Sequence, residues 1–126
     1  MKITAKRRKG NHGEEVAFSY LKKNKYKILD RNYESRFGEI DIIAKKDKTV
    51  VFVEVKSQDA GLNKDLYPER NVNTVKMRKI IRTAEYYLID NKYPDDTDWR
   101  VDVIGVDLDY FTRTAELRHL KNAATK

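Results

Sequence analysis

Two runs of apolar side chains lie close together near the middle of the chain. Residues 38–44 and 50–56 are both rich in β-branched side chains, which is typical of strands that are buried on both faces. Residues 45–49 between them are short and polar, so we predict an antiparallel hairpin. Each run nevertheless carries charge inside its apolar sequence, at Glu39, Asp41, Glu54 and Lys56.

The remaining pattern predicts two helices and three further strands. Apolar residues at helical spacing predict amphipathic helices over residues 13–24 and 72–90. Shorter apolar stretches predict strands over residues 26–33, 100–106 and 112–120. We expect a polar loop at residues 57–70, beside the hairpin, to act as a lid or as a plain connector. This order predicts one α/β domain over residues 1–126, with a mixed five-stranded sheet flanked by helices.

The charges in the hairpin would meet on one face of the sheet. If the chain turns at residues 47–48, Asp41 lies opposite Glu54 and Glu39 lies opposite Lys56, whereas an odd-length loop would separate them. Directly opposed residues have Cβ atoms roughly 4.5–5.5 Å apart. Two carboxylates at that separation must share a proton or hold a cation, unless they belong to a structural ion-pair network. A divalent cation with oxygen ligands is the simplest of these solutions.

These residues also resemble a known family. Asp41 followed by Glu54-x-Lys56 is similar to the pattern of the PD-(D/E)XK nuclease superfamily. The sequences Gly-Glu-Ile-Asp at residues 38–41 and Val-Glu-Val-Lys at residues 53–56 resemble the YraN family of small bacterial, endonuclease-like proteins. The resemblance extends over nearly the whole chain. It implies a restriction-endonuclease-like core and metal-dependent cleavage of DNA, including branched DNA in repair or recombination.

The same resemblance suggests a role for each site residue. Asp41, Glu54 and the backbone carbonyl of Val55 would hold Mg²⁺ or Mn²⁺. Lys56 would orient the attacking water or stabilise charge on the phosphate. The predicted register, and not the resemblance, places Glu39 opposite Lys56, where it would restrain that lysine. Glu14, in a Gly-Glu motif, would be a further acidic residue of the site. The helical spacing places Glu14 on the core-facing side of the predicted helix and Glu15 toward solvent. From its position alone, Glu14 is better explained as a first-turn acid that favours the helix dipole.

The charge of the chain points to a polyanionic partner. Its net charge is +7, for which nucleic acid is the first candidate and an anionic membrane the second. We expect residues 1–10 to form a flexible basic arm that contacts nucleic acid through Lys6, Arg7, Arg8 and Lys9. The second helix, capped by Asn71 or Asn73, begins with a basic cluster. Two members of that cluster are predicted to bind nucleic acid, Lys76 (by the family resemblance) and Lys79.

The composition of the chain argues against several classes of protein and kinds of site. Charged residues make up 37% of the chain and no apolar run approaches the roughly 20 residues that cross a bilayer, so we expect no membrane partner. The absence of cysteine excludes disulfides and thiolate ligands, and the absence of a signal peptide favours the cytoplasm. The resolvase resemblance makes a homodimer one option. Two alternatives to an enzyme remain open: a non-cleaving nucleic-acid-binding module, and a protein-interaction factor.

Overall fold

The computed structural model describes residues 5–60 and 67–124, with side chains from residue 12 onward. The elements in chain order are α1 Ala5–Lys23, β1 Lys27–Ser35, β2 Gly38–Lys46, β3 Thr49–Asp59, η1 Pro68–Asn71, α2 Thr74–Asp90, β4 Trp99–Asp109 and β5 Thr114–Leu120. The sequence therefore predicts the type and order of both α-helices and all five strands.

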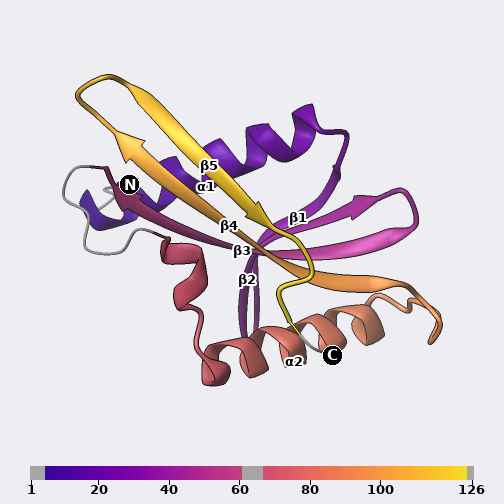
Figure 1. Cartoon of the computed structure of the whole chain (residues 1–126). Coiled ribbons are helices and arrows are strands. Elements are labelled where there is room, and N and C mark those ends of the chain that lie inside the picture. The colour runs from indigo at the N-terminus through magenta and orange to yellow at the C-terminus, as the bar shows by residue number, and fades with distance from the viewer. Residues whose placement is uncertain (1–4, 61–66, 125–126) are drawn as a thin grey trace.

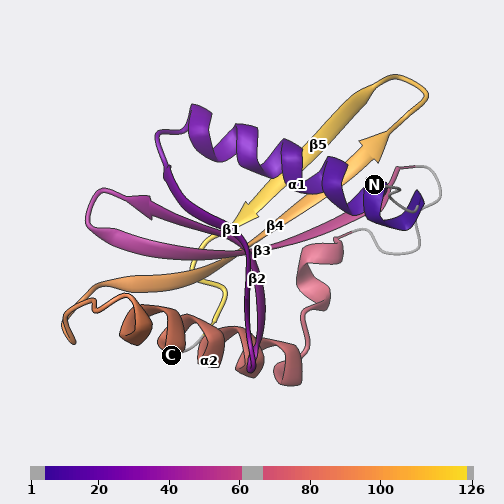
Figure 2. The ribbon, with the colours of Figure 1, turned by 180° about the vertical axis from the view of Figure 1, so that it is seen from behind.

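The strands form one mixed sheet with the spatial order β1-β2-β3-β4-β5. Neighbouring strands are antiparallel except for β3 and β4, which are parallel because the chain crosses between them through α2. Figures 1 and 2 show α1 and α2 on opposite faces of this sheet. The predicted α/β architecture, a mixed five-stranded sheet flanked by helices, is confirmed.

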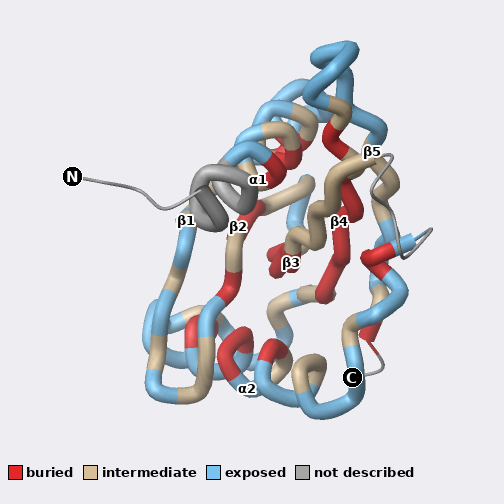
Figure 3. Tube along the Cα trace, turned by 90° about the vertical axis from the view of Figure 1, so that its left-hand side faces the viewer, coloured by how far each residue is buried: buried red, intermediate tan, exposed pale blue. Residues whose placement is uncertain are grey.

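Each helix closes its own apolar core against the central strands. Ala17 and Leu21 of α1 pack with one face of β3, whereas Ile80 and Ala84 of α2 pack with the other face. Side chains of β3 alternate between the two cores, and residues Val50 to Val53 are all fully buried. Figure 3 shows the buried positions concentrated on the central strands and on the inner sides of both helices. Burial on both faces explains the continuous apolar run of this strand.

Helix α1 begins at Ala5, eight residues before its predicted start at Gly13. Residues 5–10 therefore belong to the helix and not to a flexible arm, since Ala, Lys and Arg all favour helical backbone. The side chains predicted to bind nucleic acid at Lys6, Arg7, Arg8 and Lys9 lie outside the described residues. No helix in the described ranges is long and apolar enough to cross a bilayer.

The predicted loop at residues 57–70 is shorter than expected. Strand β3 continues to Asp59 because it keeps pairing with β4, and the chain enters η1 at Pro68. Residues 61–66, on which the predicted lid depends, lie outside the described residues.

Helix α2 starts at the asparagine that its sequence favours. Asn73 is the N-cap, and its side-chain oxygen accepts a hydrogen bond from the backbone N–H of Lys76 at 2.8 Å. This bond satisfies one of the free N–H groups in the first turn. Of the two predicted caps, Asn73 is therefore the correct one.

We expect Asn73→Ala to lower the free energy of unfolding by about 1 kcal/mol, because the capping bond is lost. Urea unfolding followed by circular dichroism measures the change. Asn91→Ala, at the other end of α2, provides a comparison in which the N-cap is intact. A variant as stable as the wild type would show that this cap contributes nothing to the fold.

The hairpin register follows the predicted two-residue turn. Lys46 pairs with Thr49, and the ladder of β2 and β3 continues to the pair Ile42–Val53. There it stops, one position before Asp41 and Glu54 would pair. Beyond this point β2 stays with β1, while β3 stays with β4. The predicted opposition of Glu39 and Lys56 is therefore wrong, because their strands have separated.

Candidate active site

The separation of β2 from β3 places an acidic side chain in the gap. Asp41 follows the last ladder pair, and its Oδ2 accepts a hydrogen bond from the backbone N–H of Val55 at 2.7 Å. The carboxylate of Asp41 thus satisfies an N–H group that would otherwise have no hydrogen-bond partner across the gap between the strands. Asp41 therefore contacts the Glu54–Lys56 segment, as predicted, but it does so through this hydrogen bond and not through cross-strand pairing.

The alternation of side chains between the two faces of the sheet is also interrupted at Asp41. Strands β1 and β2 pair on both sides of Asn32 and Asp41 but not at these two residues, and Asn32 has a positive φ of 53°. Ile42 contributes to the core beneath α1, whereas Ile40 contributes to the core beneath α2. Regular alternation would have placed both on one face. Figure 1 shows the end of the β1–β2 hairpin directed toward α2. The missing pair at Asn32 and Asp41 accompanies this change of direction.

Glu54 is the buried acid of the site. It is only 5% exposed, and its Oε2 lies 3.3 Å from Nζ of Lys76 and 3.9 Å from Nζ of Lys56. Lys56 thus contacts Glu54 on its own strand and makes no ion pair with Glu39 within the described residues. The expectation that Glu39 restrains Lys56 is therefore not met. Lys76, predicted only to bind substrate, is an ion-pair partner of Glu54.

Burial and like charge act together on Asp41. Loss of solvent is the largest cause that raises the pKa of Asp41, and the charge of Glu54 is the next. A hydrogen bond between these carboxyl groups adds to the effect, and the Val55 N–H opposes it, leaving the pKa of Asp41 at about 8. The raised pKa of Asp41 indicates that Lys56 and Lys76 do not fully neutralise the negative charge of the neighbouring Glu54.

Glu14 is close enough to this charge to respond to it. Burial raises the pKa of Glu14, the charge of Arg31 opposes this, and the charges of Glu39 and Glu54 raise the pKa further. Glu15, one residue on, is exposed and pairs with Arg31 at 2.8 Å. Helix α1 therefore directs Glu14, and not Glu15, toward the acidic group on the sheet, as the helical pattern predicts.

The donor set fits a hard divalent cation in composition. Asp41, Glu54 and the Val55 carbonyl supply only oxygen, and Mg²⁺ is commonly held by one or two carboxylates together with water. Within the described ranges, no group of three or more acidic or histidine side chains is arranged to hold a metal. Binding of a divalent cation here would therefore depend on two carboxylates and one backbone carbonyl, and these three ligands remain a prediction.

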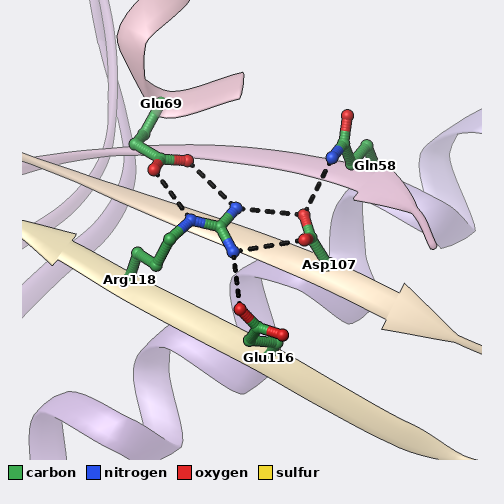
Figure 4. Close-up of polar contacts among 5 residues, drawn as sticks. All are labelled: Gln58, Glu69, Asp107, Glu116 and Arg118. Atoms are coloured by element: carbon green, nitrogen blue, oxygen red, sulfur yellow. Dashed lines mark hydrogen bonds and ion pairs between the residues drawn. The ribbon is translucent and has the colours of Figure 1, made fainter. Parts of the chain in front are cut away.

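Sequence reasoning missed a second ionic network, shown in Figure 4. Arg118 of β5 donates to both oxygens of Glu69 in η1, at 2.8 and 3.2 Å, and also to both oxygens of Asp107 at 3.1 Å. Glu69 is 4% exposed and lies over Gly105, where any Cβ would overlap its carboxylate. The glycine inside a strand is the available sequence signal, because it indicates a close approach of another group.

This network positions the start of α2 beside the site. Glu69 lies in η1, which packs against β3 and β4 and ends three residues before Thr74, the first residue of α2. Gly105, beneath Glu69, pairs with Lys56 on the neighbouring strand. The Arg118 network therefore fixes the segment from which Lys76 reaches Glu54.

A third network, around Asp102 and His119, is structural. The fully buried Asp102 accepts hydrogen bonds from Arg100 at 3.0 Å and from the backbone N–H of Asn122 at 2.9 Å, and its other oxygen lies 2.7 Å from Nε2 of His119. The opposite ring nitrogen of His119 bonds the hydroxyl of Tyr20. These bonds join α1 to the sheet and leave Asp102 without a role in the acidic site.

The comparisons with known proteins agree with the resemblance seen in the motifs. Residues 13–106 match the model of "Uncharacterised protein family UPF0102". A UPF0102 protein of Alkaliphilus oremlandii is 43% identical over 90% of this chain and 95% of its own length. Another, from Caldicellulosiruptor saccharolyticus, is 39% identical over 94% of this chain and 98% of its own length. This chain therefore belongs to the UPF0102 family, the YraN family that its motifs resemble.

Proposed function

We propose that this protein is a metal-dependent endonuclease that hydrolyses phosphodiester bonds in DNA, including branched DNA. The observation that carries the proposal is the buried acidic pair with lysine beside it. Asp41 has a pKa raised to about 8 next to the buried Glu54, whose Oε2 is 3.9 Å from Nζ of Lys56. A fold gains no stability from two acids held this way, so their presence together favours a chemical role.

Each residue has a definite task in this reaction. Asp41, Glu54 and the Val55 carbonyl would hold Mg²⁺ or Mn²⁺, which when bound supplies a water of lowered pKa and neutralises phosphate charge. Lys56, 34% exposed, lies at the open side of Glu54 and orients the attacking water or stabilises the phosphate. Glu14 adds a carboxylate from α1 that can accept a hydrogen bond from that water.

We expect the wild type to cut branched DNA in the presence of Mn²⁺ and to lose the activity in EDTA. Lys56→Met should lower the rate by about a hundredfold, because one donor to the reacting phosphate is removed. Cleavage of labelled flaps, junctions and plain duplexes measures the effect. Lys48→Met, which removes an exposed lysine from the hairpin turn, is the matched control. Equal rates for wild type and Lys56→Met would indicate a contaminating nuclease and would remove the enzymatic proposal.

One observation favours a non-cleaving DNA-binding module as the second candidate. Nζ of Lys76 lies 3.3 Å from Oε2 of Glu54, so this acid has a cationic partner within the protein itself. A structural ion pair of this kind needs no metal. DNA binding with a steep salt dependence, but without cleavage under any metal, would establish this candidate.

A further inference from the structure

A basic groove lies between the β1–β2 turn and the outer face of α2. Its volume is about 500 Å³, and it is lined by Arg36, Phe37, Arg78, Lys79, Ile81, Arg82 and Glu85. Glu85 is the single acid among these residues. The groove and the acidic site are distinct, but both adjoin α2, because Lys76 precedes the groove residues on the same helix.

The sequence builds this groove by bringing the turn close to the helix. Gly38 has a φ of +147°, and a Cβ at that position would lie 3.2 Å from Oγ1 of Thr83 and 3.7 Å from Cβ of Lys79. Glycine therefore allows the turn to lie against α2. The ring of Phe37, the residue before Gly38, packs edge-on against Tyr86 with centroids 5.6 Å apart.

The aromatic ring organises the arginines. The guanidinium carbons of Arg36 and Arg82 lie 5.0 and 5.5 Å from the centroid of Phe37, one supplied by the turn and the other by the helix. Arginine over an aromatic face is held in place while its N–H groups remain free to bind. Phe37 is half-buried, so it supports the arginines rather than serving as an exposed stacking surface.

The cations of the groove form no ion pair within the described part of the chain. Arg36, Arg78, Lys79 and Arg82 are all exposed, and none forms an ion pair with another described residue. Elsewhere in the described chain, Arg31, Arg100 and Arg118 each pair with a carboxylate. Four neighbouring positive charges repel one another, and binding of an external anion relieves this repulsion.

We propose that the groove binds the phosphodiester backbone of one DNA strand and directs that strand toward the acidic site. This inference rests on the proposed function and adds the path of the substrate. From Lys76 to Arg82 the helix rises by about 9 Å, at 1.5 Å per residue. That length corresponds to about two or three nucleotides of one DNA strand. The planar arginine groups suit bidentate contact with phosphate oxygens.

The groove fits nucleic acid better than a membrane surface. Interfacial membrane binding requires apolar side chains that enter the lipid as well as cations. The apolar side chains of the groove, Phe37 and Ile81, are half-buried against the protein. The exposed part of the groove is therefore charged, which is the surface that contacts with a phosphate backbone need.

The test compares two double charge reversals with equal effects on net charge. Arg78→Glu/Arg82→Glu changes the groove, and Lys48→Glu/Lys121→Glu changes two exposed lysines elsewhere that also lack ion pairs with described residues. Fluorescence anisotropy with a labelled DNA junction, in EDTA over a series of KCl concentrations, gives Kd and its salt dependence. Circular dichroism confirms that both proteins are folded.

We expect the groove variant to bind at least about tenfold more weakly, and its slope of log K against log salt to be smaller by about 1.8, or 0.9 per lost phosphate contact. The control variant should differ from the wild type by less than about threefold, because its cations contribute only to net charge. Equal losses in both variants, or no DNA binding by the wild type, would overturn the proposal.

Two further results separate this inference from the proposed function. Groove-dependent binding by a protein that never cuts DNA would support the groove and refute the nuclease. Metal-dependent cutting with binding unchanged in Arg78→Glu/Arg82→Glu would refute the groove and leave the nuclease standing. Vesicles of phosphatidylserine and phosphatidylcholine provide the competing surface, and a loss confined to vesicle binding would also overturn the proposal.

Discussion

Asp41→Asn should lower metal-dependent cleavage by about a thousandfold or more and, in EDTA at pH 8, should make the protein more stable than the wild type. The loss of activity follows from the loss of an anionic ligand beside Glu54. The gain in stability follows from removing a charge that the folded protein disfavours. Asparagine can still accept the hydrogen bond that Asp41 receives from Val55 at 2.7 Å.

The direction of the pH effect follows from the raised pKa. Burial and the charge of Glu54 raise the pKa of Asp41 from 3.8 to about 8, so the folded state binds a proton that the unfolded state has released. The wild type therefore loses stability as the pH rises from about 4 to about 8. An asparagine side chain cannot ionise, so the Asp41→Asn protein should lack this part of the pH dependence and should be stabilised by about 1 kcal/mol or more at pH 8.

Urea unfolding in EDTA at about pH 5 and pH 8 measures this difference, because most of the expected pH-dependent loss of stability falls between these two values. Asp96→Asn, which neutralises an exposed acid in the turn before β4, is the matched control. It should leave both activity and stability close to those of the wild type. An Asp41→Asn protein that is less stable than the wild type at pH 8 would contradict the charge conflict described for this site.

Arg118→Ala should lower the free energy of unfolding by about 3–5 kcal/mol, because it leaves the buried carboxylate of Glu69 without its cation. Arg118 binds Glu69 and Asp107 with two hydrogen bonds each, and the Glu69 side chain is only 3% exposed. Arg118 also contacts Glu116 at 3.3 Å, but that side chain is 76% exposed. Solvent therefore screens the Glu116 pair, which contributes little.

Thermal and urea unfolding of three variants test this assignment. Gly105→Ala should be destabilised to a comparable degree, because the added Cβ would displace the carboxylate of Glu69 from Arg118. Glu116→Ala should change stability by less than about 0.5 kcal/mol. An Arg118→Ala protein with wild-type stability would show that the network of Figure 4 does not hold η1 on the sheet.

The central hairpin is the part that sequence predicts best. Its apolar runs and short polar turn predict the strands and their register, and the pairing of Lys46 with Thr49 confirms them. The same reasoning identifies Asp41 and Glu54 as neighbours. Local pattern suffices here because the residues involved lie within one hairpin, where the turn determines which positions meet.

The contacts that complete the site depend on topology and could not be predicted from local pattern. Lys76 reaches Glu54 only because α2 follows η1 back across the sheet, and Glu69 meets Arg118 across 49 residues of sequence. The separation of β2 from β3 depends on an interruption at Asn32, on the neighbouring strand. The early start of α1 lay in a basic segment without an apolar stripe, where periodicity carries no signal.

The position of Arg118 has a consequence for how the protein is made. Strand β5 follows every residue of the acidic site along the chain, and Glu69 receives its arginine only from that strand. During synthesis on the ribosome, the first four strands and both helices emerge before this cation exists. The bonds that hold η1 on the sheet can therefore form only after the last strand has been translated, so this part of the fold is completed late.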